Sequence, residues 1–157
     1  MDEKTLNAIV SSVASQITDA DMTLDTALEL SAKVKEKAKE MGVKAVVAIS
    51  NKAARPVLVE CMDDSYIASY GVAFNKAYTV VALKMSTSEL KKLSQPGGSL
   101  YGIQFTNNGK IVIFGGGEPL YNKAGKLIGG LGVSGGSEEQ DAALAKYGKE
   151  IFNTIDR

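Results

Sequence analysis

The sequence predicts an α+β domain in which helices flank an antiparallel sheet of about five strands. Three observations lead to this fold class. Apolar residues recur at helical spacing at both ends of the chain and near its middle. Apolar runs of strand length separate these segments, and short clusters of turn residues join the runs as hairpins, which pair strands antiparallel. A chain of 157 residues fits one domain and can bury a core without disulfides or metals.

Two helices are expected at the start of the chain. From Leu6 to Ile17 apolar residues repeat at three- and four-residue steps, which indicates an amphipathic helix. The polar segment 18–21 is interpreted as a linker. A second helix is expected to begin after Thr23, whose hydroxyl suits an N-cap. It would end at Gly42, because glycine takes the left-handed turn there at little cost.

A hairpin and two further helices are expected next. Val43–Ser50 and Arg55–Met62 are apolar runs of strand length, and the residues between them would form the turn. Ser65–Lys84 returns to helical spacing, and a capping-box pattern at Ser86 and Glu89 predicts the start of a short helix. The apolar stripe of the long helix comprises Ile67, Phe74, Tyr78 and Val81.

The last third of the chain is expected to complete the sheet and add a helix. Asn108-Gly109 predicts a second hairpin, because both central residues of such a turn need positive φ. It would join a strand at 101–105 to another at 110–114. A final strand is expected at 126–133, and a capping box that begins at Ser137 predicts the C-terminal helix.

The composition excludes several classes of function. Lysine plus arginine equals aspartate plus glutamate at 18 each, so the surplus of cations typical of nucleic-acid binders is absent. No apolar run approaches the roughly 20 residues that a membrane span needs. The sequence holds no histidine, which excludes a Ser-His-Asp or Cys-His pair within the chain and also His-ligated zinc or haem. The single Cys61 cannot form an internal disulfide, which agrees with a cytoplasmic location.

Two glycine-rich stretches have both a structural and a ligand-binding interpretation. Gly130–Gly135 has the G-x-G-x-x-G spacing of a dinucleotide site, but no strand follows it, which argues against a Rossmann unit. Gly135, Gly136 and Ser137 precede a helix, so they could hold an anion or simply form a turn and a cap. At Gly115–Gly117 a ligand or another backbone could approach closely, or the glycines could form a bulge.

Several segments in order along the chain resemble the GlcG/HbpS family, which includes the C-terminal domain of PduO-type adenosyltransferases. We therefore predict an N-terminal amphipathic helix and linker at 1–22 and a GlcG/HbpS-like domain at 23–157. The segments that carry the resemblance are Thr23–Ala27, Val46–Ile49, Asn51–Pro56, Met62–Asp64, Lys76–Thr79, Thr87 with Leu90, Gly115–Leu120, Ile128–Gly136 and Glu139–Asp141.

The resemblance implies a profilin-like fold and homo-oligomers that reach octamers. It also implies haem binding in several members and a link to diol or glycolate utilisation in others. Two departures limit what carries over. Asn51 and Ala54 stand where the family usually has an aspartate and a glycine, and the His-ligated haem mode cannot operate without histidine.

The N-terminal segment is similar to the short helices that direct cargo into bacterial microcompartments. Residues 1–20 would then contact a shell or cargo protein, and the chain would be cytoplasmic and microcompartment-associated. Alternatively, the helix packs on its own domain or across a subunit interface.

Three functions are compatible with these patterns. We favour a non-catalytic accessory protein that binds a small molecule or a cofactor such as haem or a corrinoid, with Met62, Cys61, Tyr66, a lysine or an exogenous group as the iron ligand. The alternatives are a structural subunit with protein partners only, and an enzyme that uses Lys76 with a nearby carboxylate. The carboxylates considered are Asp63, Asp64 and Glu118. The expected ligand-binding residues are Lys76, Thr79, Gly115, Gly116, Gly117, Pro119, Ser134 and Gly135.

Overall fold

The computed structural model describes residues 1–17 and 20–155, with only the backbone described at 15–17. Residues 18 and 19 of the predicted linker lie outside this part. The elements in chain order are α1 (Glu3–Ile17), α2 (Leu24–Glu40), β1 (Val46–Asn51), β2 (Pro56–Cys61), α3 (Ile67–Leu83), α4 (Thr87–Leu93), the short 3₁₀ turns η1 (Ile103–Phe105) and η2 (Asn107–Gly109), β3 (Gly117–Tyr121), β4 (Leu127–Ser134) and α5 (Glu138–Ile155).

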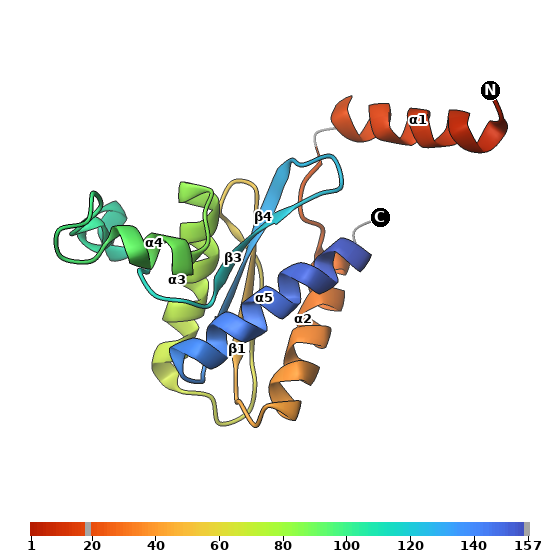
Figure 1. Ribbon diagram of the computed structural model, residues 1–157. Coiled ribbons are helices and arrows are strands. Elements are labelled where there is room, and N and C mark those ends of the chain that lie inside the picture. The colour runs from red at the N-terminus through yellow and green to blue at the C-terminus, as the bar shows by residue number, and fades with distance from the viewer. Residues whose placement is uncertain (18–19, 156–157) are drawn as a thin grey trace.

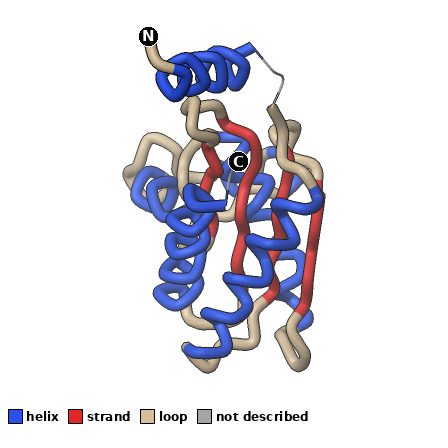
Figure 2. Tube along the Cα trace, turned by 90° about the vertical axis from the view of Figure 1, so that its right-hand side faces the viewer, coloured by secondary structure: helices blue, strands red, loops and turns tan. Residues whose placement is uncertain are grey.

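The sheet has four strands in the order β2-β1-β4-β3, and every neighbouring pair is antiparallel. Helices α2 and α5 cover one face, and α3 covers the other (Figure 1). The predicted α+β class with an antiparallel sheet and flanking helices is confirmed. The view turned by 90° shows the strands running between the helical layers, with α1 standing apart at one end (Figure 2).

The larger part of the hydrophobic core lies between the sheet and the α2/α5 layer. Val47 and Ile49 of β1 and Leu131 and Val133 of β4 are fully buried there, together with Leu144 of α5. The opposite face is built from smaller side chains, because α3 lies close to the sheet. Its buried apolar residues are Val46, Ala48, Ala73 and Ala77.

Two glycines of β4 explain the close approach of α3. A side chain at Gly130 would place its Cβ 2.5 Å from the carbonyl oxygen of Ala77, and one at Gly132 would collide with the carbonyl oxygen of Ala73. These glycines lie inside a strand rather than in a strand-to-helix turn. The G-x-G-x-x-G spacing therefore serves helix packing, as expected where a backbone approaches a strand closely.

The local signals for helix ends are confirmed. The hydroxyl of Thr23 accepts a hydrogen bond from the backbone N–H of Thr26, and Ser86 forms a complete capping box with Glu89. Ser137 and Gln140 form the reciprocal pair that begins α5. Gly42 follows α2 with φ +69°.

The predicted hairpin around Asn108-Gly109 is wrong, and the sheet has four strands instead of about five. Asn107 and Asn108 do take positive φ, but they form the 3₁₀ turn η2 rather than a strand connection. The predicted second strand lies along α3, where the hydroxyl of Thr79 accepts the backbone N–H of Val112. The proton of this hydroxyl is shared between the carbonyl oxygens of Asn75 at 2.7 Å and Lys110 at 3.2 Å. Because these backbone groups bond to a side chain of α3, no strand partner is needed.

Candidate functional site

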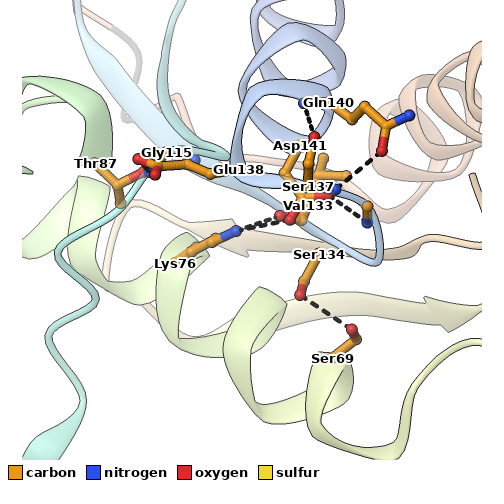
Figure 3. Close-up of polar contacts among 12 residues, drawn as sticks. Ser69, Lys76, Thr87, Gly115, Val133, Ser134, Ser137, Glu138, Gln140 and Asp141 are labelled. Atoms are coloured by element: carbon orange, nitrogen blue, oxygen red, sulfur yellow. Dashed lines mark hydrogen bonds and ion pairs between the residues drawn. The ribbon is translucent and has the colours of Figure 1, made fainter.

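Lys76 has the largest fully buried polar side chain among the described residues. Lys76 lies on α3 and its side chain is 0% exposed. The ammonium donates to the carbonyl oxygen of Val133 at 2.8 Å and to the carboxylate of Asp141 at 3.3 Å (Figure 3). The ring centre of Phe114 lies 4.9 Å from it, close enough for a cation–π contact.

Asp141 in the first turn of α5 is the carboxylate partner of this lysine. Its other oxygen accepts the backbone N–H of Gly136 at 2.8 Å. Burial lowers the pKa of Lys76 and raises the pKa of Asp141, since removal from water disfavours each charged form. The attraction between the two groups and the hydrogen bond from Gly136 oppose these shifts but do not cancel them.

Three helices converge on Gly115–Gly117, the stretch that leads into β3. The N–H of Gly115 donates to Glu138 of α5 at 3.0 Å, and the N–H of Gly117 donates to the hydroxyl of Thr87 in α4 at 2.9 Å. Gly116 has φ +117°, and a Cβ there would lie 2.5 Å from the ammonium of Lys76. The space beside this stretch is therefore occupied by the protein's own side chains.

The structure brings together only part of the predicted site. Lys76 and Gly115–Gly117 are adjacent, and Pro119 follows in β3. Thr79 instead bonds the segment that precedes the glycines. Ser134 donates a hydrogen bond to Ser69, which lies nearer the start of α3 than Lys76 does (Figure 3). A Cβ at Gly135 would collide with the carbonyl of Lys44, so that glycine allows a close backbone crossing.

The carboxylates proposed for an enzyme lie elsewhere. Asp64 pairs with Lys44 at 3.3 Å, and Glu118 pairs with Lys149 at 2.9 Å. Asp63 borders a surface groove beside α2. Sequence reasoning missed Asp141 as the partner of Lys76, although the segment Glu139–Asp141 contributed to the family resemblance.

With both charges paired and the neighbouring space filled, the Lys76–Asp141 pair ties α3 and α5 to β4. The arrangement leaves the amine buried behind Phe114, whose own side chain is 39% exposed. This geometry supports a structural role, because the bonds from Lys76 to Val133 and Asp141 connect a helix on each face of the sheet to β4.

A groove of about 920 Å³ lies between α2 and the end of β2. Residues Ala32, Lys35, Glu36 and Lys39 of α2 form one wall at i, i+3, i+4 and i+7 spacing, which places them on one helix face. The floor and opposite wall include Val43, Lys44, Met62, Asp63 and Asp64. The volume is within the range of about 300–1,000 Å³ that is usual for small-molecule sites.

Two sulfur-containing residues border this groove, and they differ in surroundings. Met62 is partly buried against the core, and its sulfur accepts the backbone N–H of Ala45 at 3.3 Å. Cys61 is exposed and pairs in register with Val46, whose side chain faces α3. Because cross-strand partners share a face, the thiol points to the face of the sheet opposite α2.

A second groove of about 810 Å³ lies between α1, the start of α2 and the β3–β4 turn. Its charged lining is mainly acidic, with Asp21, Asp25 and Glu29 against Lys123. In the described part of the chain, no three histidine, cysteine or acidic side chains gather closely enough to hold a metal ion. No helix within residues 1–17 and 20–155 is long and apolar enough to cross a membrane.

The fold and the site define a small α+β domain built on a four-stranded antiparallel sheet with helices on both faces. A family model described as haem degrading protein, HbpS-like, matches residues 22–150. The chain therefore belongs to the HbpS-like family, and the predicted resemblance is confirmed.

Relatives of known sequence extend this assignment. The chain is 41% identical over 136 residues to an uncharacterised 15.0 kDa protein in the dhaT-dhaS intergenic region of Citrobacter freundii, covering 87% of this chain and 95% of that protein. It is 42% identical over 118 residues to the corrinoid adenosyltransferase PduO of Salmonella typhimurium. That match covers 75% of this chain but 35% of PduO.

Two solved structures are also similar. The ORFY protein of Klebsiella pneumoniae aligns with a TM-score of 0.82 and 38% identity, covering 86% of this chain and 93% of that one. A complex of PduOC with haem aligns with a TM-score of 0.79 and 37% identity, covering 83% of this chain and 94% of PduOC.

Proposed function

We propose that this protein is a non-catalytic accessory protein that binds a tetrapyrrole in diol or glycolate utilisation. The observation that carries the proposal is the likeness to PduOC, which was solved as a haem complex. The match to the HbpS-like family and to a part of a corrinoid adenosyltransferase supports the same class of ligand.

The α2–β2 groove combines the thioether of Met62 with three lysines and three carboxylates. The chain has no histidine, so an iron ligand from the protein must come from another side chain. Met62 supplies a neutral thioether of the kind that ligates haem iron in cytochromes c. Lysines suit the carboxylates of the porphyrin, and their aliphatic stems can pack on its ring.

A haem titration followed by the Soret band tests the proposal. A saturable, stoichiometric spectrum that differs from that of free haem is the expected result. A parallel titration with cobalamin separates a haem protein from a corrinoid protein. If neither tetrapyrrole binds saturably, the accessory role must be independent of tetrapyrroles, and a structural subunit with protein partners becomes the better hypothesis.

A second role is favoured by the exposed apolar stripe of α1. Its four large apolar side chains are between 45% and 57% exposed, although their spacing is that of an amphipathic helix whose apolar face packs on a partner. They are Leu6, Ile9, Val10 and Val13. We propose that this stripe docks on a microcompartment shell or cargo protein, which would place the cytoplasmic chain inside such a compartment.

Deletion of residues 1–20 tests this role. Loss of co-fractionation with purified shells, with an unchanged circular-dichroism spectrum, is the expected result. As a matched control, a Val10→Leu variant keeps the stripe apolar and should still co-fractionate. Co-fractionation of the deletion variant at the level of the full chain would remove α1 from targeting.

A further inference from the structure

We infer that the open edge of β2 pairs with β2 of a second copy of this chain, which joins two four-stranded sheets into one of eight strands. The inference does not depend on the proposed ligand or on α1. It assigns a partner and a surface through main-chain donors and acceptors, which the sites described above do not use.

The two edges of the sheet differ in how they are protected. The edge strands are β2 and β3. Strand β3 is blocked, because Pro119 in its middle has no N–H and the N–H of Gly117 already donates to the hydroxyl of Thr87 in α4. Strand β2 has its proline, Pro56, at its first residue, and the irregularity of its ladder lies at the same end. The rest of β2 is therefore open to another strand.

The main-chain groups of β2 alternate between β1 and the outside. The N–H of Met62, directly after β2, donates to the carbonyl oxygen of Ala45 and fixes this alternation. Because bonded and unbonded residues alternate along an antiparallel ladder, Glu60 bonds to β1, whereas Val59 and Cys61 direct their N–H and C=O groups outward. In the described part of the chain, no other hydrogen bond involves these outward groups. Unpaired groups of this kind form a template for another strand.

The side chains of β2 do not protect this edge with a charge. Within Pro56–Cys61 the charged residue is Glu60, and it faces α2. Its carboxylate binds Lys35 at 2.8 Å and accepts the hydroxyl of Ser31. Charged side chains that point outward commonly prevent edge strands from pairing, and β2 lacks this device.

An exposed apolar stripe of α3 continues the same surface. The rings of Tyr70 and Phe74 stack with their centres 6.3 Å apart, and Phe74 lines a small cavity together with Pro56 of β2. Tyr66 and Ile67, one helical turn before Tyr70, are both exposed. The stripe therefore begins beyond the end of β2 and reaches its first residue on the face that α3 covers. Clustered exposure of this kind is typical of a protein interface.

A second copy fits this edge because the surface is complementary to itself. A two-fold axis perpendicular to the sheet pairs β2 with β2 antiparallel and keeps both α3 helices on one face. The two aromatic stripes then meet above the joined strands. A register centred on Glu60 would oppose two carboxylates directly, which is unfavourable. A register centred on Val59 sets Glu60 opposite Leu58 of the partner subunit and is the one we assign.

The test is amide hydrogen exchange of the full chain, followed residue by residue by NMR over a series of protein concentrations. Where sedimentation shows association, exchange at Val59 and Cys61 should slow by at least about tenfold, because pairing protects their outward N–H groups. Glu60 is the internal control. Its N–H bonds to β1 in the free chain as well, so its exchange should be slow at every concentration.

Two variants test the strand and the stripe separately. Val59→Pro removes an outward N–H without removing a bond to β1 and should raise the dissociation constant of the pair by at least about tenfold. Tyr70→Glu charges the stripe and leaves the strand intact, and it should also weaken the pair. Tyr101→Glu is the matched control, because Tyr101 is equally an exposed tyrosine but lies on the loop between α4 and β3. Circular dichroism reports whether each variant folds.

Fast exchange at Val59 and Cys61 in a chain that associates would overturn the inference, and so would a chain that stays monomeric at every concentration. Equal weakening by Tyr70→Glu and Tyr101→Glu would overturn the placement of the partner beside α3. The exchange measurement uses the unaltered chain, so its result stands whether or not Val59→Pro folds.

Discussion

Lys76 and Asp141 are 65 positions apart in the chain, yet their charged groups lie 3.3 Å from each other inside the protein. Lys76 belongs to the helix on one face of the sheet, and Asp141 belongs to a helix of the opposite layer. The lysine also donates to the carbonyl of Val133 in β4, which lies between the two helices. The pair therefore connects all three layers at one end of the sheet.

Removing one member of this pair should be more harmful than removing both. Lys76→Met leaves the Asp141 carboxylate buried without its cation, which typically costs roughly 3–5 kcal/mol. The double variant Lys76→Met/Asp141→Asn removes both charges, and we expect it to recover much of that loss. Urea denaturation of the single and double variants measures the coupling. Additive losses in the double variant would show that the two groups act independently.

Gly116 should not tolerate a methyl group. Its φ of +117° disfavours any side chain, and a Cβ would lie 2.5 Å from the Lys76 ammonium and 2.6 Å from the Val133 carbonyl oxygen. We expect Gly116→Ala to destabilise the fold by roughly 1–3 kcal/mol.

Gly71→Ala is the matched control for this substitution. Gly71 lies in α3 with no neighbouring atom near the added Cβ, so alanine there should stabilise the helix by about 0.5–1 kcal/mol. Thermal denaturation followed by circular dichroism compares the two. Equal effects of the two substitutions would contradict the packing argument.

Glu138 should make the fold sensitive to acid. The N–H of Gly115 and the ammonium of Lys91 hold the pKa of Glu138 below its ordinary value of 4.5. A carboxylate with a lowered pKa adds stability that is complete above the unfolded value and is lost as pH falls through the folded value. The stability difference between the wild-type chain and Glu138→Gln should therefore be constant at neutral pH and shrink below pH 4.5.

Glu139→Gln controls for the loss of one negative charge in the same helical turn, since Glu139 is exposed. Its stability difference from the wild-type chain should change less between neutral and acidic pH. Urea titrations at a series of pH values give both curves. A Glu138→Gln curve parallel to that of the wild-type chain down to pH 3 would remove Glu138 from the acid response.

Helix ends were predictable because their signals are local. The caps at Thr23, Ser86 and Ser137 depend on residues three positions away. Strand β3 was missed, because Gly117 and Pro119 are typical of turns. Proline fits there since β3 is an edge strand, and that position depends on non-local pairing with β4.

The surroundings of Lys76 were predictable only in part. Lys76 and the three glycines could be identified from the family resemblance, but the groups that surround them could not. An acid in the first turn of a helix already has a sufficient local explanation in the helix dipole, so Asp141 gave no further signal. The α2–β2 groove also escaped, because it joins a helix face to a strand end more than 20 residues away.

The outer surface at the start of α3 supports the prediction of a homo-oligomer. Ile67 is 98% exposed, and Tyr66 and Tyr70 beside it are 73% and 53% exposed. The predicted apolar stripe is therefore covered only in part: Ile67 is exposed and Val81 is buried. The side chains of α3 that pack on the sheet are Ala73 and Ala77. Clustered exposure of large apolar side chains is typical of a protein interface.

A charge at Ile67 should weaken this association if copies of the chain meet there. We expect Ile67→Asp to raise the dissociation constant of the oligomer by at least about tenfold, because a buried unpaired charge is costly. The sedimentation profile should then shift toward smaller species. Leu28→Asp is the control, because Leu28 is 43% exposed on α2 and away from this surface. If both variants sediment like the wild-type chain, the oligomer interface lies on another face, and α1 with its exposed stripe is the next surface to test.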